Sequence, residues 1–167
     1  IRANDEHTDW KDIRLYIQTF RKQNLNFLEI LFTPYKILNP MYGNQWNRLI
    51  NSKEDIAHYS PVQAIKSMRG IAKEKYFAME HHYPSRMEWI NKYLYDPKQL
   101  HHLLRVEEYI ERYIDGESYE SCLHSKMPDF LKQVKTGKSF DLDAARVVAK
   151  KSIDHIDEMC DEFLKNE

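Results

Sequence analysis

The chain has 167 residues, of which 42% are hydrophobic, and its formal net charge at pH 7 is −1. This length suits one domain, or one domain plus a fragment of another. The balanced charge excludes a strongly basic surface of the kind that binds nucleic acid without sequence preference. The sequence contains neither an apolar run near the roughly 20 residues of a membrane span nor the pattern of a signal peptide, so we expect no membrane partner.

The two cysteines, Cys122 and Cys160, show no spacing typical of a disulfide framework. Free thiols are typical of reducing compartments, and we therefore expect a cytoplasmic protein. The chain starts with Ile1 rather than methionine, which leads us to expect a fragment of a longer protein.

The first 40 residues mix strand-like and helix-like patterns. Residues 1–9 are polar, whereas apolar and polar side chains alternate over residues 10–16, which is typical of a short strand. Residues 17–23 show helical spacing, and residues 27–32 form an apolar run too short to assign to helix or strand. We expect a short α/β leader in this region.

From about residue 42 the pattern becomes helical. Residues 46–50 are spaced for one short helix. Ser60 is a good cap and Pro61 a good first residue for a long helix, which we expect to run to about His81. Its apolar residues recur at helical spacing: Ala64, Ile65, Met68, Ile71, Ala72, Tyr76 and Met79.

The segment from Asp96 to Gly116 predicts a second long helix. Asp96 is a good N-cap, Pro97 suits the first helical position and Gly116 follows the expected end. Its apolar residues are Leu100, Leu103, Leu104, Ile110 and Ile114, with Val106 and Tyr113 at the flank.

A third long helix is expected after Asp141, another good N-cap, and a shorter helix is expected between Pro128 and Gly137. The apolar face of the third long helix comprises Leu142, Ala145, Val148, Ala149, Ile153, Ile156, Met159, Cys160, Phe163 and Leu164. Amphipathic helices must bury their apolar stripes against one another. We therefore predict a mainly α fold, a helical bundle of three long helices plus shorter ones, with a short N-terminal α/β leader.

Two charged residues fall on apolar stripes. Lys75 lies on the stripe of the first long helix and Glu107 on that of the second. A buried charge costs several kcal/mol unless an opposite charge meets it, so we expect Lys75 and Glu107 to pair. Such a pair either fixes the register of two helices or lines a polar pocket that receives a charged ligand.

A second cluster lies near the start of the central helix. His101, His102, Arg105 and Glu108 are close in sequence, and His101, Arg105 and Glu108 share one edge of the helix. Arg105, with Lys98 beside it, could hold a phosphate group. The alternative is an ordinary solvated face.

A metal site is a further alternative for these histidines. His101 and Glu108 supply only two ligands from one helix, and a metal would need more, such as His81 and His82. We regard the phosphate interpretation as the better of the two.

Four stretches together carry a resemblance: residues 12–16 (Asp-Ile-Arg-Leu-Tyr), residues 22–32, residues 74–76 (Glu-Lys-Tyr) and, above all, residues 95–105. This pattern resembles the predicted nucleotidyltransferases of phages and bacteria, members of the DNA polymerase beta superfamily. The resemblance covers most of the chain.

The matched part is the downstream part of such proteins. Their defining motif is a Gly-Ser dipeptide followed by an Asp-x-Asp metal pair, and this sequence contains no Gly-Ser. Asp141 and Asp143 form such a pair but lie too late in the chain. Residues 137–139 (Gly-Lys-Ser) are similar to the end of a phosphate loop, but Lys132 replaces its earlier glycine. We expect this chain to be inactive on its own.

The resemblance implies that residues 1–40 are the remnant of an α/β nucleotidyltransferase core and that residues 41–167 form a helical domain. It implies a catalytic role for Asp12 as the third carboxylate of a Mg²⁺ site in the full-length protein, where the metal neutralises phosphate charge during transfer. A surface carboxylate is the alternative for Asp12. The substrates would be a nucleoside triphosphate and an unknown acceptor. The residues expected to bind the nucleotide are Lys75, Arg105, His101, His102 and Glu107.

The alternative function is a non-catalytic helical module that binds a protein or single-stranded nucleic acid. The aromatic residues in question are Tyr83, Trp89, Tyr93 and Tyr95, with Arg86, Lys92 and Lys98 between them. Exposed aromatic rings with interleaved cations suit single-stranded nucleic acid, whereas buried ones would pack the edge of a bundle. A purely structural, dimerising bundle is a third possibility.

Overall fold

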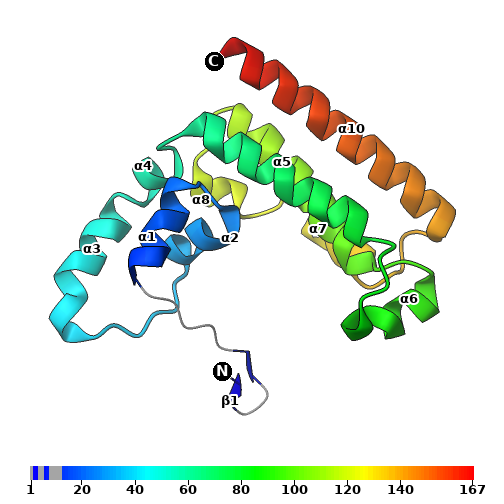
Figure 1. The fold of residues 1–167 in the computed structure, drawn as a ribbon, viewed down its shortest axis with the longest axis horizontal. Coiled ribbons are helices and arrows are strands. Elements are labelled where there is room, and N and C mark those ends of the chain that lie inside the picture. Colours follow the sequence, from blue (N-terminus) through cyan, green and yellow to red (C-terminus); the bar gives the residue numbers. More distant parts are fainter. Residues whose placement is uncertain (1, 4–5, 8–12) are drawn as a thin grey trace. The chain divides into compact units, whose positions relative to one another are not determined.

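The computed structural model describes residues 2–3, 6–7 and 13–167, and these are mainly α-helical, as predicted (Figure 1). The chain divides into two compact units, Ile1–Ala64 (unit 1) and Ile65–Glu167 (unit 2). The expected boundary after residue 40, between a nucleotidyltransferase remnant and a helical domain, stays a prediction. None of the helices in the described part of the chain is long and apolar enough to cross a membrane.

Unit 1 consists of short elements. They are β1 (Arg2–Ala3), β2 (Glu6–His7), α1 (Ile13–Arg21), α2 (Leu25–Leu28), η1 (Glu29–Phe32), η2 (Pro40–Tyr42), α3 (Gly43–Asn51) and α4 (Lys53–Ala57), where η denotes a 3₁₀ helix. The two strands pair in antiparallel fashion. The buried apolar residues of this unit are Phe20, Leu25, Leu28, Leu31, Ala57 and Ala64.

The strand expected over residues 10–16 is wrong in its described part, because Ile13–Tyr16 form the start of α1. The helix packs Tyr16 against Phe20 one turn later, with ring centroids 4.8 Å apart. The Tyr16 hydroxyl also donates to the Phe27 carbonyl at 3.2 Å. An i, i+4 ring contact of this kind stabilises a helix and is not available within a strand.

Unit 2 contains the three expected long helices. Its elements are α5 (Pro61–Ala78), which begins four residues before the unit does, η3 (Pro84–Arg86), α6 (Met87–Tyr93), α7 (Pro97–Ile114), α8 (Tyr119–Cys122), α9 (Pro128–Lys135) and α10 (Leu142–Asn166). α7 packs against both α9 and α10, and α10 also runs beside α5 (Figure 1). Arg69 of α5 joins α10 through Asp157 at 2.6 Å and Asp161 at 2.7 Å.

The N-terminus of α7 is fixed as its sequence predicts. Asp96 caps the helix by accepting from the backbone N–H of Lys98 at 2.9 Å, and Pro97 takes the first helical position. Farther along, Leu100, Leu103 and Ile110 are buried. Val106 and Tyr113, expected at the flank of the stripe, are buried too. The buried surface is wider than predicted, because α7 also buries Glu108, Tyr109 and Arg112.

A close contact links α6 to the turn after α9. Gly137 has φ 71°, a left-handed conformation, and a Cβ atom placed there would lie 2.5 Å from the Tyr93 ring. The Tyr93 hydroxyl donates to the Thr136 carbonyl at 3.1 Å. Glycine is therefore required at position 137 both by its backbone conformation and by the neighbouring ring.

Candidate anion-binding site

His101 and His102 lie side by side near the start of α7. Both side chains are half-buried, and their ring centroids are 5.0 Å apart at an interplanar angle of 72°. The Nδ1 atom of His101 is buried and has no hydrogen-bond partner in the described part of the chain. Most buried polar atoms have a partner, so the unpaired nitrogen is an exception within the described residues.

Burial and nearby cations both act on the two rings. Burial, followed by the charges of Lys135, Arg105 and Lys98, lowers the pKa of His101 to about 4. Burial likewise lowers the pKa of His102 to about 4, with contributions from its neighbour His101 and from nearby cations. Both imidazoles are therefore neutral at pH 7.

The cations of this cluster come from three helices. Lys98 and Arg105 belong to α7, Lys135 ends α9, and Lys75 of α5 acts on His102. We call these four cations and the two histidines the basic histidine site. The structure thus brings together four of the residues expected to bind a nucleotide, which are Lys75, Arg105, His101 and His102. Lys135 was missed, because sequence periodicity does not show that α9 packs against this part of α7.

The expected pairing of Lys75 with Glu107 is wrong. Lys75 Nζ binds the Oε1 of its neighbour Glu74 at 2.7 Å. Glu107 Oε1 instead contacts Nδ1 of His155, on α10, at 2.9 Å. α10 packs against α7 and supplies a nearer partner than α5 does. Glu107 therefore contacts α10 and is not part of the basic histidine site.

Two metal sites were considered from the sequence, one at Asp12 and one at the histidines. Asp12, expected to help hold Mg²⁺, lies outside the described residues, so its catalytic role stays a prediction. Within the residues that the structure describes, no three His, Cys, Asp or Glu side chains form a group that could hold a metal ion. The structure thus gives no support to the alternative in which His101, Glu108, His81 and His82 bind a metal.

The aromatic surface expected for nucleic acid is only partly exposed. Tyr95 is fully buried, and its hydroxyl donates to the Phe140 carbonyl at 3.0 Å. Trp89 and Tyr93 stack on each other with centroids 5.8 Å apart. Arg86 is held by Asp96. These contacts pack the edge of unit 2, which is the alternative that the sequence left open.

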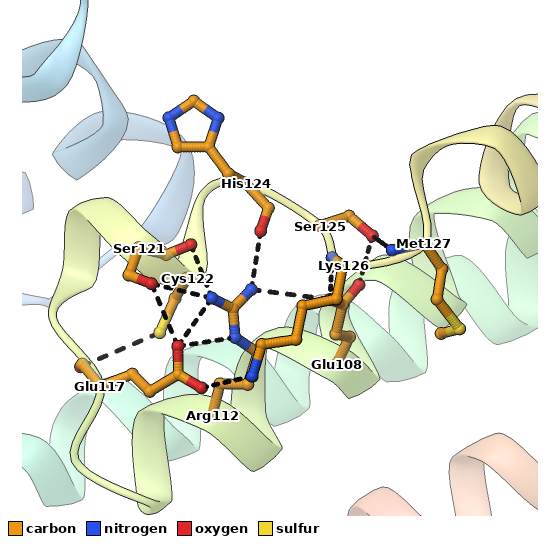
Figure 2. A network of polar contacts seen from close by, with 9 residues as sticks. All are labelled: Glu108, Arg112, Glu117, Ser121, Cys122, His124, Ser125, Lys126 and Met127. Carbon is orange, nitrogen blue, oxygen red and sulfur yellow. Dashed lines mark hydrogen bonds and ion pairs between the residues drawn. The ribbon is translucent and has the colours of Figure 1, made fainter.

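A second polar cluster, the Arg112 network, contains charged groups of both signs (Figure 2). Arg112 is only 6% exposed. Its guanidinium donates to Glu117 Oε2 at 2.7 and 3.0 Å and to the carbonyls of Ser121 and His124 at 2.9 and 2.7 Å. It also lies 3.5 Å from Glu108 Oε1.

Glu108 and Glu117 supply the carboxylates of this network. Glu108 is buried and accepts from the Ser125 hydroxyl and the Lys126 backbone N–H. The hydrogen bonds from Arg112 and Lys126 lower the pKa of Glu117 to about 2. The network fastens residues 117–127, including α8, onto α7 (Figure 2). Because its guanidinium is already saturated by protein acceptors, its role is structural.

The Arg112 network was missed by sequence reasoning, which placed Glu108 at the edge of the histidine cluster. The only local signal is the i, i+4 spacing of Glu108 and Arg112, which is more typical of an exposed helical pair. The remaining partners follow α7 in the chain, and their position depends on the turn at Gly116.

Comparisons with protein-family models, with curated proteins and with solved structures gave no match for this chain. The resemblance to phage and bacterial nucleotidyltransferases therefore stays a prediction from the residues that carry it.

Proposed function

We propose that unit 2 binds the phosphate groups of a nucleotide at the basic histidine site. In this proposal the chain is the helical portion of a nucleotidyltransferase, which moves a nucleoside monophosphate from a nucleoside triphosphate to an acceptor. The proposal is based on four cations, Lys75, Lys98, Arg105 and Lys135, which act on the half-buried rings of His101 and His102 from three helices.

Lys98, Arg105 and Lys135 are like charges that repel one another, whereas Lys75 is already paired with Glu74. A bound anion would relieve the repulsion among the first three. Arg105 offers a planar fork of donors suited to phosphate oxygens, whereas Lys98, Lys75 and Lys135 act as point charges. Several cations acting on the same two rings suit a polyanion better than a single carboxylate.

The test measures binding rather than transfer, because the resemblance implies that transfer needs a Gly-Ser dipeptide followed by an Asp-x-Asp pair, and this sequence contains no Gly-Ser. Isothermal titration calorimetry on the whole chain compares adenosine triphosphate, inorganic tripolyphosphate and adenosine. We expect the two phosphate compounds to bind and adenosine to bind far more weakly. Tighter binding of adenosine triphosphate than of tripolyphosphate supports a nucleotide, and equal affinity supports a phosphate site only.

Charge-reversing variants locate the binding. Lys75→Glu, Lys98→Glu, Arg105→Glu and Lys135→Glu should each weaken tripolyphosphate binding about tenfold or more, since each turns an attraction into a repulsion. Lys151→Glu is the matched control, because Lys151 is exposed on α10 and does not act on either histidine. Equal effects of Lys151→Glu and Arg105→Glu would mean that binding follows net charge alone and would refute the proposed site.

A further inference from the structure

A cavity of about 360 Å³ lies in unit 2, between the end of α7 and the last turns of α10. Its lining comes from residues between 111 and 115 and between 159 and 167. Its volume falls within the range of roughly 300–1,000 Å³ that is typical of pockets for small molecules. The residues of the basic histidine site do not line it, so it is a separate candidate site.

Three apolar side chains form the more deeply buried part of the lining. Ile114 is the last residue of α7, and Met159 and Phe163 lie one turn apart on α10, and all three are half-buried. Residues four apart lie on one face of a helix, so Met159 and Phe163 present one apolar face of α10 to the cavity. A ligand that covers this face needs an apolar body.

Three exposed carboxylates lie beside this apolar part. Glu111 and Asp115 are one turn apart at the end of α7, and Glu162 precedes Phe163 on α10. No lysine, arginine or histidine among the described residues lines the cavity. The C-terminal end of a helix such as α7 adds partial negative charge. The cavity therefore complements a positively charged ligand.

The cations of unit 2 do not neutralise these carboxylates. Within the part of the chain that the structure describes, Glu111, Asp115 and Glu162 take part in no ion pair. Arg112, which follows Glu111 in the chain, binds Glu117 instead at 2.7 Å. The negative charge at the cavity thus has no cation of the described chain to balance it.

An organic cation fits this arrangement better than a metal ion. A divalent metal needs several oxygen ligands at roughly 2.0–2.6 Å, and no three His, Cys, Asp or Glu side chains of the described residues form such a group. Carboxylates spread around an apolar surface suit an ammonium group on an apolar body. The ring of Phe163 also offers a face against which an ammonium group is attracted.

We propose that this cavity binds a small organic cation, an amine whose apolar body lies against Met159 and Phe163 and whose ammonium group is attracted by Glu111 and Glu162. This inference is independent of the proposed nucleotide binding, because the two sites share no residue and favour ligands of opposite charge.

The experiment compares three probes of nearly the same shape. At about pH 7 benzylamine is a cation, benzyl alcohol is neutral and benzoate is an anion. Binding to the whole chain is measured by NMR at millimolar probe concentrations and low salt, and the methyl signal of Met159 should shift. Benzylamine should bind about tenfold more tightly than benzyl alcohol, and benzoate should bind most weakly. Added salt should reduce the advantage of benzylamine, because exposed charges are screened.

Substitutions of exposed residues test the assignment with little effect on the fold. Glu111→Gln and Glu162→Gln should each weaken benzylamine binding about threefold and leave benzyl alcohol binding unchanged, because they remove a charge and keep the size of the side chain. Glu88→Gln is the matched control, because Glu88 is exposed on α6 and does not line the cavity.

Three results would overturn the inference: no binding of benzylamine, equal binding of benzylamine and benzyl alcohol to the unchanged chain, or equal effects of Glu162→Gln and Glu88→Gln. The first would mean that only solvent occupies the cavity. The second would mean that the carboxylates do not act on the ligand, and the third that benzylamine binding follows the net charge of the chain.

Discussion

Asp96 binds Arg86 through both carboxylate oxygens while it caps α7. The Nε and Nη2 atoms of Arg86 lie 2.6 and 2.7 Å from Oδ2 and Oδ1 of Asp96. Asp96 is 1% exposed. Burial by itself would raise the pKa of Asp96, but the hydrogen bonds from Arg86 and from the Lys98 backbone hold it below its usual value. One carboxylate thus joins the segment before α6 to the start of α7.

Replacing Asp96 with alanine should be strongly destabilising. The change removes a cap and leaves the Arg86 guanidinium without its partner, and we expect a loss of about 3 kcal/mol in the free energy of unfolding. Urea denaturation followed by circular dichroism measures this loss. Asp141→Ala is the control, because Asp141 caps α10 from an exposed position and its loss should cost only about 1 kcal/mol. An equal decrease in the free energy of unfolding in the two variants would show that the ion pair between Arg86 and Asp96 does not contribute to stability.

The Arg112 network predicts a large effect of a single substitution. Arg112→Met should lower the free energy of unfolding by about 3 kcal/mol, because Glu108 would remain buried without its cation. Arg112→Lys should restore little, since one ammonium cannot reach the same set of acceptors. Both are measured by urea denaturation.

The control for Arg112 is Arg146→Met. Arg146 contacts Glu80 at 2.6 Å, but its side chain is 51% exposed, and exposed pairs contribute at most about 1 kcal/mol. If Arg112→Met were no more destabilising than Arg146→Met, the structural role of the network would be wrong.

The histidine pair predicts a loss of stability in mild acid. The pKa values of His101 and His102 are about 4 in the folded chain, against about 6.5 in an unfolded one. As the pH falls, the unfolded chain takes up protons first. The stability that depends on neutral histidines is therefore complete above about pH 6.5 and is lost progressively toward pH 4.

Lowering the pH from about 7 to about 5 should reduce the free energy of unfolding by roughly 2 kcal/mol through the two histidines together, after allowance for partial solvent screening. The carboxylates with lowered pKa values, such as Asp96 and Asp157, act only below about pH 4.5. Urea denaturation at the two pH values measures the difference. In the double variant His101→Gln, His102→Gln the free energy of unfolding should fall much less between these pH values. The same fall in the variant as in the unchanged chain would show that the two histidines are not its cause.

Anion binding should oppose this acid effect. A phosphate group beside the rings favours their charged form, so tripolyphosphate should raise the pKa of His101 and His102. NMR titration of the imidazole C–H signals, with and without tripolyphosphate, measures the change. His58, in unit 1, provides an internal reference. Identical shifts for all histidines would indicate a general salt effect.

The long helices could be predicted because their signals are local. Helical spacing of apolar residues together with caps at Asp96 and Asp141 gave the starts of α7 and α10 correctly. Local signals failed in residues 10–16, where short alternation favoured a strand and the described residues form a helix. There the contacts of Tyr16 with Phe20 and Phe27 decide the structure.

The site was predicted in part for a related reason. A helical wheel places Lys75 and Glu107 on inward faces, but it does not say which helix each face meets. Glu107 meets His155 of α10, an element far away in sequence. His101, His102 and Arg105 were found because they are neighbours on one helix, whereas Lys135 depends on how α9 packs.

The contact between Tyr93 and Gly137 affects the order in which substitutions at these two positions could accumulate. A side chain at position 137 would collide with the Tyr93 ring. Replacing Tyr93 with a smaller residue first would remove this collision. Even then φ 71° would remain, and asparagine or aspartate would be tolerated better than most other residues. Replacing Tyr93 before Gly137 is therefore the less strained order, because the reverse order forces the Tyr93 ring to move.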